Sequence, residues 1–196
     1  MKTATPGRGL TIVCLLAIAA LNTSVARAAD ERAAAARAAT DNFQAALRAE
    51  LVKGLEEGGP AGAIAVCRDK APEIAACLGR ETGWQVGRTG PLVRNAANAP
   101  DAWEAQGLAE FAVRQKAGES LIRMEKGEVV TQPDGKRAYR FLKAIPMGAA
   151  CVTCHGAAID TLLMAKIRQL YPEDKAVGFS PGELRGAFTI TQPLPD

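Results

Sequence analysis

The sequence has few of two kinds of side chain on which many proteins depend. Aromatic residues make up 5% of its 196 residues, and histidine occurs once. Grooves and stacking platforms for nucleic acids combine clustered basic residues with aromatic ones, so no nucleic-acid partner is expected. A single histidine excludes zinc and copper sites that are built from several imidazoles. A catalytic triad would have to use that same histidine.

The first 28 residues have the composition of a secretory signal peptide. Lys2 and Arg8 supply a positive start, an apolar run follows over residues 10–21, and Ala26-Arg27-Ala28 has small residues at the spacing of a cleavage site. At about 12 residues, the run is shorter than the roughly 20 that a membrane-spanning helix needs. We therefore expect an exported, for example periplasmic, protein with no membrane span after signal cleavage. A retained N-terminal anchor helix is the alternative.

The net charge of the chain belongs to this segment. The sequence has 24 Lys and Arg residues against 21 Asp and Glu residues, a formal net charge of +3. Cleavage after Ala28 removes three of the basic residues, Lys2, Arg8 and Arg27, and none of the acidic ones, so 21 of each sign remain. A neutral domain has no electrostatic steering toward a strongly charged partner.

Hydrophobic periodicity predicts helices in the first part of the mature chain. Residues 30–57 carry an apolar side chain at every fourth position from Phe43 to Leu55, which is typical of an amphipathic helix, and Gly58-Gly59-Pro60 ends it. Further helices are expected over residues 61–69, 72–78, 101–116 and 157–170. For the helix at 101–116, Asn98 is the expected N-cap.

Strands are expected later in the chain. Residues 128–131 and 136–145 flank Gln132-Pro133-Asp134-Gly135, and Asp-Gly between two such runs favours a hairpin. Residues 183–192 are expected to form a final, returning strand. Helices followed by a hairpin, a helix and a strand predict an α+β domain with an antiparallel sheet. We divide the chain into a signal peptide (1–28), an N-terminal amphipathic helix (29–60) and one domain (61–196).

The sequence Cys151-Val152-Thr153-Cys154-His155 has the C-x-x-C-H pattern of c-type haem attachment. The two thiols add across the haem vinyl groups as thioethers, and the adjacent imidazole then lies under the iron as its proximal ligand. Export agrees with this interpretation, since it places the chain where such attachment occurs. We expect one covalently bound haem c per chain. A disulfide or redox-active cysteine pair is less favoured because the motif follows a hairpin late in the chain, and zinc would need a fourth ligand.

The sixth ligand of the iron must be something other than a second histidine of this chain. Met124, Met147 and Met164 are candidates for a His/Met pair, which raises the reduction potential. Cys67 or Cys77 would instead supply a thiolate, which lowers the potential by donating negative charge to ferric iron. Sequence spacing does not choose among these five residues, and each type is more often a packing residue than a ligand.

Four further stretches accompany the C-x-x-C-H motif in order along the chain, at residues 63–67, 83–89, 93–104 and 182–191. Together they resemble the periplasmic c-type haem domains, a family long catalogued as a domain of unknown function, over about residues 61–194. The resemblance implies a PAS-like antiparallel sheet with a long N-terminal helix and a covalently attached haem. Members of this family occur alone or ahead of signalling domains, and since no kinase or methyl-accepting pattern appears up to Asp196, we do not expect signalling in cis.

The resemblance also implies site residues. Position by position, His155 is the proximal iron ligand and Cys67 the distal thiolate, whereas Cys77 matches no family ligand. Arg88 and Arg94 fall within family motifs, and guanidinium groups are suited to haem propionates through paired hydrogen bonds. Salt bridges within a loop are an equally good explanation for these two arginines.

Two functions from different classes fit these features. The first is an exported monohaem protein acting in electron transfer or as a redox partner. The second is a haem-based redox or gas sensor that signals through a separate partner, in which reduction releases Cys67, opens a site for a small gas and moves the helix that bears it. The partner in either case is an unidentified redox or signalling protein. We expect no enzymatic activity, because a peroxidase would lack a distal histidine.

Overall fold

The computed structural model describes the chain from residue 10 to residue 195, with side chains from residue 27 onward. The chain divides into two compact units, Met1–Ala35 and Ala36–Asp196. The first is described from residue 10 and is helical from there, as the first part of α1 (Leu10–Ala65). Of the expected signal peptide, residues 1–9 lie outside the described residues and residues 10–26 are described by their backbone alone, so the signal peptide stays a prediction. Within the described part, no helix combines the length and apolar character that crossing a membrane requires.

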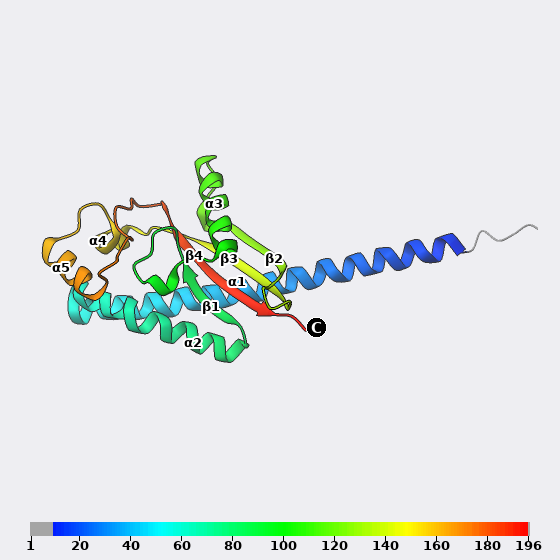
Figure 1. Cartoon of the computed structure of the whole chain (residues 1–196), viewed down its shortest axis with the longest axis horizontal. Helices are drawn as coiled ribbons and strands as arrows, with labels where there is room; N and C mark the ends of the chain where they lie inside the picture. The colour runs from blue at the N-terminus through cyan, green and yellow to red at the C-terminus, as the bar shows by residue number, and fades with distance from the viewer. Residues whose placement is uncertain (1–9, 196) are drawn as a thin grey trace, which may run out of the picture. The chain divides into compact units, whose positions relative to one another are not determined.

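A four-stranded antiparallel sheet forms the centre of the second unit (Figure 1). Its strands are β1 (Gln85–Thr89), β2 (Glu125–Thr131), β3 (Arg137–Pro146) and β4 (Leu184–Pro193), in the order β1-β4-β3-β2. β2 and β3 form the expected hairpin, and Gly135 adopts the positive φ of 82° that its turn requires. The last strand therefore lies inside the sheet, and the predicted α+β class with an antiparallel sheet is confirmed.

One face of the sheet is covered by α3 (Ala102–Lys116). The buried side chains between them come from α3, from the short η3 (Leu121–Arg123) and its flank, and from β3 and β4: Leu108, Phe111, Leu121, Met124, Leu142, Ala144, Leu184 and Ala187. The contact is close at Gly107, where a Cβ would overlap the side chain of Leu142. This layer is an apolar core that holds α3 on the sheet.

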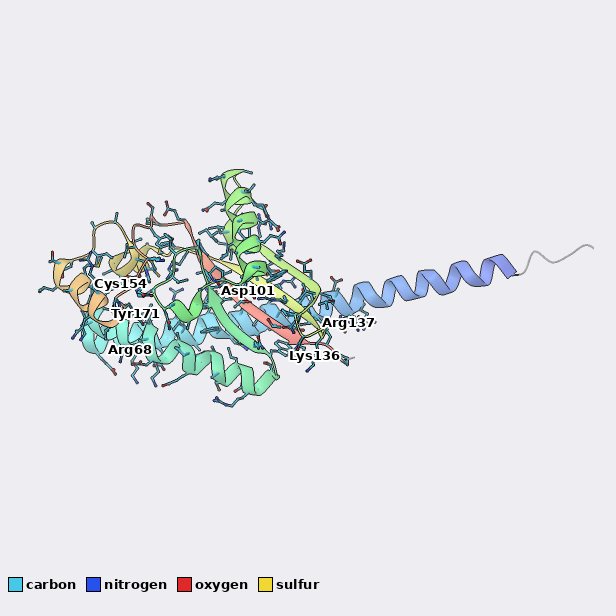
Figure 2. The ribbon with its side chains drawn as sticks, viewed as in Figure 1. Arg68, Asp101, Lys136, Arg137, Cys154 and Tyr171 are labelled. Carbon is cyan, nitrogen blue, oxygen red and sulfur yellow. The ribbon has the colours of Figure 1, made fainter. Side chains whose placement is uncertain are left out.

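The start of α3 differs from the prediction. Its N-cap is Asp101 (Figure 2), whose carboxylate accepts a hydrogen bond from the N–H of Glu104, while the Glu104 carboxylate accepts one from the N–H of Asp101. This reciprocal capping box satisfies two N–H groups that the helix leaves free. Asn98 was the wrong choice because it belongs to η2 (Ala96–Asn98), a 3-10 turn that is itself capped by Asn95.

The opposite face of the sheet is covered by the part of α1 that lies in the second unit. Before the break at Gly59, the buried residues of this part of the helix are Ala36, Ala39, Thr40 and Phe43. The rings of Phe43 and Phe188 lie 5.4 Å apart between centroids. Because Phe188 follows Ala187 along β4, and neighbouring strand residues point to opposite faces, α1 and α3 lie on different sides of the sheet.

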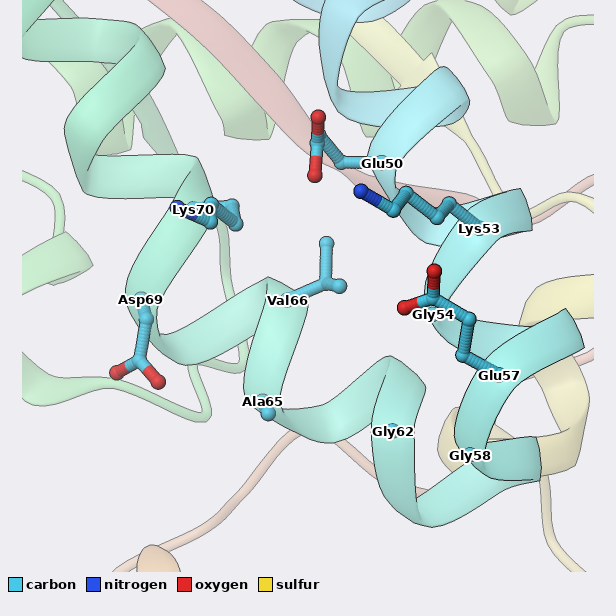
Figure 3. A pocket seen from close by; sticks show the side chains of 10 residues that line it. All are labelled: Glu50, Lys53, Gly54, Glu57, Gly58, Gly62, Ala65, Val66, Asp69 and Lys70. Atoms are coloured by element: carbon cyan, nitrogen blue, oxygen red, sulfur yellow. The ribbon is translucent and has the colours of Figure 1, made fainter.

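α1 is interrupted at Gly59, where the sequence predicts a break. Gly59 has φ 59° and ψ −155°, and Pro60 follows it. The chain then turns back and passes through a π-helical turn, η1 (Val66–Lys70), into α2 (Ala71–Thr82). Where the two arms meet, Gly62 lies so close to Gly54 that a Cβ on Gly62 would overlap the Gly54 carbonyl oxygen (Figure 3).

The segment between β3 and β4 contains three short helical elements, η4 (Ala149–Cys151), α4 (Val152–His155) and α5 (Thr161–Leu170). α5 begins four residues later than residue 157, the predicted start, because Asp160 caps it by accepting hydrogen bonds from the N–H groups of the second and third helical residues. It packs against the end of α1 through a buried cluster of Ile64, Leu163, Ile167 and Tyr171.

Candidate functional site

The residues of the C-x-x-C-H motif lie on one short helical turn. Cys151 ends η4, and Cys154 and His155 end α4. Cys154 is half-buried against the cluster that joins α1 to α5, whereas Cys151 is exposed. Among the described residues every cysteine is a free thiol, so neither Cys151 nor Cys154 is engaged in a disulfide.

The ring of His155 is held by a backbone carbonyl. Its Nδ1 lies 2.7 Å from the carbonyl oxygen of Ala176, so a neutral ring carries its proton on Nδ1 and keeps a lone pair on Nε2. Burial, helped by the nearby charges of Arg185 and Arg94, lowers the pKa of His155 to about 3. The imidazole is therefore neutral near pH 7, which is the form in which histidine binds a metal.

The loop that carries Ala176 is fastened to α4 by backbone hydrogen bonds. The N–H of Phe179 donates to the carbonyl of His155 and the N–H of Gly178 to the carbonyl of Gly156, both at 3.0 Å. Ala176 and Phe179 are buried with Met147, and Val152 packs against them. The His155 ring is thus oriented by a packed loop.

Arg94 and Asp174 form a buried ion pair behind this loop. Their side chains are 8% and 4% exposed, and Arg94 Nε donates to Asp174 Oδ2 at 3.0 Å. Arg94 Nη2 also donates to the carbonyl oxygen of Cys154 at 2.6 Å and to that of Ala176 at 3.4 Å. Of the two explanations that the sequence leaves open for Arg94, the structure shows the salt bridge.

Arg88 and Arg185 lie in the same region, and no ion pair to a carboxylate is found for either within residues 27–195. The Arg88 guanidinium lies 5.7 Å from the centre of the Phe43 ring, and that of Arg185 lies 5.3 Å from the Phe179 ring. Burial lowers the pKa of both groups, and repulsion from Arg88 and Arg94 helps to bring that of Arg185 to about 10. Two half-buried cations held together favour a bound anion.

Cys67 comes from a much earlier part of the sequence than the C-x-x-C-H motif and lies near it in the fold. It is half-buried in η1, and burial raises the pKa of its thiol while Arg88 and Arg94 oppose that shift. Cys151 is close enough to influence the same thiol. The structure therefore brings together the predicted residues Cys67, Arg88, Cys151, Cys154 and His155, with Arg94 directly behind them. π-helical turns are frequent at functional sites.

Of the other sulfur candidates, Cys77 and Met124 lie away from the motif, whereas Met147 lies beside the loop that holds His155. Cys77 is exposed on α2, where its Sγ donates to Glu81. It lies ten positions after Cys67 along the helical arm, about 15 Å at the helical rise. That distance exceeds what a disulfide can bridge. Met124 is buried under α3, and Met147 packs with Ala176 and Phe179.

A cavity of about 400 Å³ is lined by residues of α1 and η1 and by none of the cysteines or His155: Glu50, Lys53, Gly54, Glu57, Gly58, Gly62, Ala65, Val66, Asp69 and Lys70 (Figure 3). Its charged side chains are of both signs.

A family model described as Tll0287-like matches residues 20–193 of the chain. The chain belongs to the Tll0287-like family. The resemblance inferred from the ordered motifs is thereby confirmed. The structure described as the cyanobacterial heme-protein Tll0287 is similar to it with a TM-score of 0.64 and 23% identity, over 85% of this chain and 97% of that one, which shows a common fold. No curated protein matches the chain.

In this member of the Tll0287-like family, sequence reasoning missed Arg185 and Asp174 as site residues. Arg185 could have been found, because it is the one charged residue of β4, half-buried at the second position of the strand between Leu184 and Gly186. Asp174 carries no such signal, since it lies in a loop and its partner is 80 residues away in the sequence.

Proposed function

We propose that this protein is an exported c-type haem protein that acts in electron transfer or as a redox partner. The observation that carries the proposal is the geometry of one turn: two free thiols, Cys151 and Cys154, beside a His155 ring whose Nδ1 is bound to a carbonyl and whose Nε2 lone pair is available. The thiols would anchor one haem c, and Nε2 would be the proximal ligand. The similar solved structure is described as a heme protein, which supports the proposal.

The donor set of the chain suits an iron porphyrin better than a bare metal ion. No group of three His, Cys, Asp or Glu side chains arranged to hold a metal occurs in the part of the chain whose side chains are described. An iron held in a haem would need only one or two ligands from the protein. His155 supplies one donor, and Cys67 supplies the other in our proposal. When bound, the haem supplies one-electron redox chemistry.

The arginines of the site have two different roles in this proposal. Arg88 is proposed to bind a propionate carboxylate, as the family resemblance implies. Arg185 is proposed to bind a propionate as well, because its guanidinium lies in the same region and has no acidic partner within residues 27–195. Arg94 is occupied by Asp174 and is assigned to positioning. We propose no catalytic role, because the iron would use the sole histidine of the sequence and leave no second imidazole for acid–base chemistry.

The test is covalent haem attachment in the mature protein, produced in a host with c-type haem maturation. We expect the wild type to keep its haem after acid–acetone extraction and to have a mass increased by one haem. The double variant Cys151→Ser/Cys154→Ser should release whatever haem it binds. A wild type without covalent haem under these conditions would contradict the proposal.

One observation favours a sensor as the second candidate. Cys67 lies in a π-helical turn between α1 and α2, so that release of this ligand would change a backbone segment that joins two helices. Carbon monoxide separates the two roles. A carrier should remain six-coordinate and inert to carbon monoxide when reduced, whereas a sensor should bind the gas in place of Cys67. The partner would be a redox protein in the first case and a signalling protein in the second.

A further inference from the structure

Behind the candidate site, a single ion pair connects three backbone segments. Asp174 Oδ2 accepts from Arg94 Nε at 3.0 Å, and Asp174 Oδ1 accepts from the N–H of Ala176 at 2.8 Å. Arg94 Nη2 in turn donates to the carbonyl oxygens of Cys154 and Ala176. A backbone bond from Lys175 N–H to the Val93 carbonyl, at 3.0 Å, runs beside the pair. The segment before α3, the C-x-x-C-H turn and the loop after α5 are thus joined at one point.

The peptide unit of Ala176 lies at the centre of this arrangement. Its carbonyl oxygen is the group that holds His155 Nδ1, and residue 176 is fully buried. Asp174 fixes the N–H of the same residue, and Arg94 approaches the same carbonyl. The position and the acceptor strength of that oxygen therefore depend on two charged side chains that do not touch the imidazole.

We propose that Asp174 and Arg94 are positioning residues that set the hydrogen bond at His155 Nδ1 and, through it, the reduction potential of the protein. This rests on the proposed function, since it assigns His155 Nε2 to the iron. Partners of a ligating histidine at its other ring nitrogen orient the ring and raise its basicity. Loosening the Ala176 carbonyl makes the imidazole a weaker donor, which disfavours ferric iron and raises the potential.

The Arg94–Asp174 ion pair differs from most other ion pairs of the chain in its burial. At 8% and 4% exposure the two side chains are shielded from water, unlike the ion pairs on the surface of the chain, whose contribution is commonly small. The comparable pair is Arg140–Glu104, with side chains 12% and 11% exposed, which lies on the α3 side of the sheet. That pair shares burial and chemistry with Arg94–Asp174 but makes no contact with the loop at Ala176, so it is a matched control.

The experiment compares holoprotein of the wild type with the variants Asp174→Asn, Arg94→Lys and Glu104→Gln. Nuclear magnetic resonance gives the exchange rate of the His155 Nδ1 proton, and redox titration gives the midpoint potential. In Asp174→Asn we expect exchange to be faster by about tenfold, which corresponds to about 1.4 kcal/mol of lost hydrogen-bond stability, and we expect a higher potential. Arg94→Lys keeps the charge but loses the planar fork, so it should also speed exchange. Glu104→Gln should lower the unfolding temperature and leave exchange and potential unchanged.

Nδ1 exchange at the wild-type rate in both site variants would overturn the inference, even if the potential moved, because the charge alone would then explain the shift. A wild type that binds no haem refutes the proposed function separately. The positioning role is then tested in the haem-free full chain by measuring hydrogen exchange at the Ala176 amide. The same measurement is used for any variant that attaches no haem. That amide should exchange faster in Asp174→Asn, and an unchanged rate would count against the pair.

Discussion

At the scale of single residues, Cys67 and Cys77 offer a direct comparison. Both are free thiols on the same helical arm, but Cys67 is half-buried near Arg88 and Cys151, and Cys77 faces solvent. We predict that Cys67→Ser changes the ferric absorption spectrum and raises the midpoint potential, because a hydroxyl does not replace the negative charge that a thiolate donates to ferric iron. Spectroscopy and redox titration check this.

Cys77→Ser is the control and should leave both quantities as they are in the wild type. A Cys67→Ser protein with an unchanged ferric spectrum would rule out this thiol as the sixth ligand. Met147, which is 2% exposed and packed with Phe179, is then the next candidate. The same measurements on Met147→Leu would test it.

The chemistry of the site could be predicted where its residues are contiguous in the sequence. Cys151, Cys154 and His155 lie within five positions, and their pattern needs no tertiary information. Cys67 was inferred through the family resemblance alone, since periodicity does not distinguish a ligand from a packing residue. Arg94 and Asp174 are 80 positions apart, and only the folded loop shows that one neutralises the other.

At the scale of elements, the helical hairpin that carries Cys67 depends on a contact between two glycines. A Cβ on Gly62 would overlap the carbonyl oxygen of Gly54, and backbone on both sides leaves little room to adjust. We predict that Gly62→Ala lowers the free energy of unfolding by about 1–3 kcal/mol, the usual cost of overpacking. Urea denaturation followed by circular dichroism measures it.

Gly58 is the matched glycine for this test, because no atom would lie within 4 Å of a Cβ there. Gly58→Ala should be neutral or should stabilise the protein by up to about 1 kcal/mol, since alanine loses less backbone entropy than glycine on folding. Equal effects at Gly58 and Gly62 would show that the two arms of the hairpin do not meet as closely as described.

Most elements were predictable from periodicity, whereas their ends and the π-helical turn were not. Asn95, Asn98 and Asp101 all lie within seven residues, and each is a good capping residue. Asp101 caps α3 because Glu104 reciprocates and both also bind Arg140, whose position comes from β3. The π-helical turn at Cys67 was not predicted, because such turns are rare and the sequence shows no local pattern for one here.

At the scale of the second unit, the arrangement of layers depends on pairings between distant segments. β4 is the last strand in sequence and lies between β1 and β3, which no local pattern reveals. It provides both faces of the core, with Ala187 under α3 and Phe188 under α1. It also carries Arg185 to the site, so the strand joins the core to the proposed anion site.

The attachment of α1 to the sheet can be divided into its apolar and its charged contacts. Phe43 is 1% exposed between the Phe188 ring and the Arg88 guanidinium, whereas Asp41, two residues earlier, pairs with Lys143 at the surface. We predict that Phe43→Ala lowers the free energy of unfolding by about 3–5 kcal/mol, because it leaves a cavity between two layers. Asp41→Ala should cost no more than about 1 kcal/mol, as a surface ion pair usually does. Denaturant titration of both variants decides the point: similar losses would mean that charge, and not the buried ring, holds this helix on the sheet.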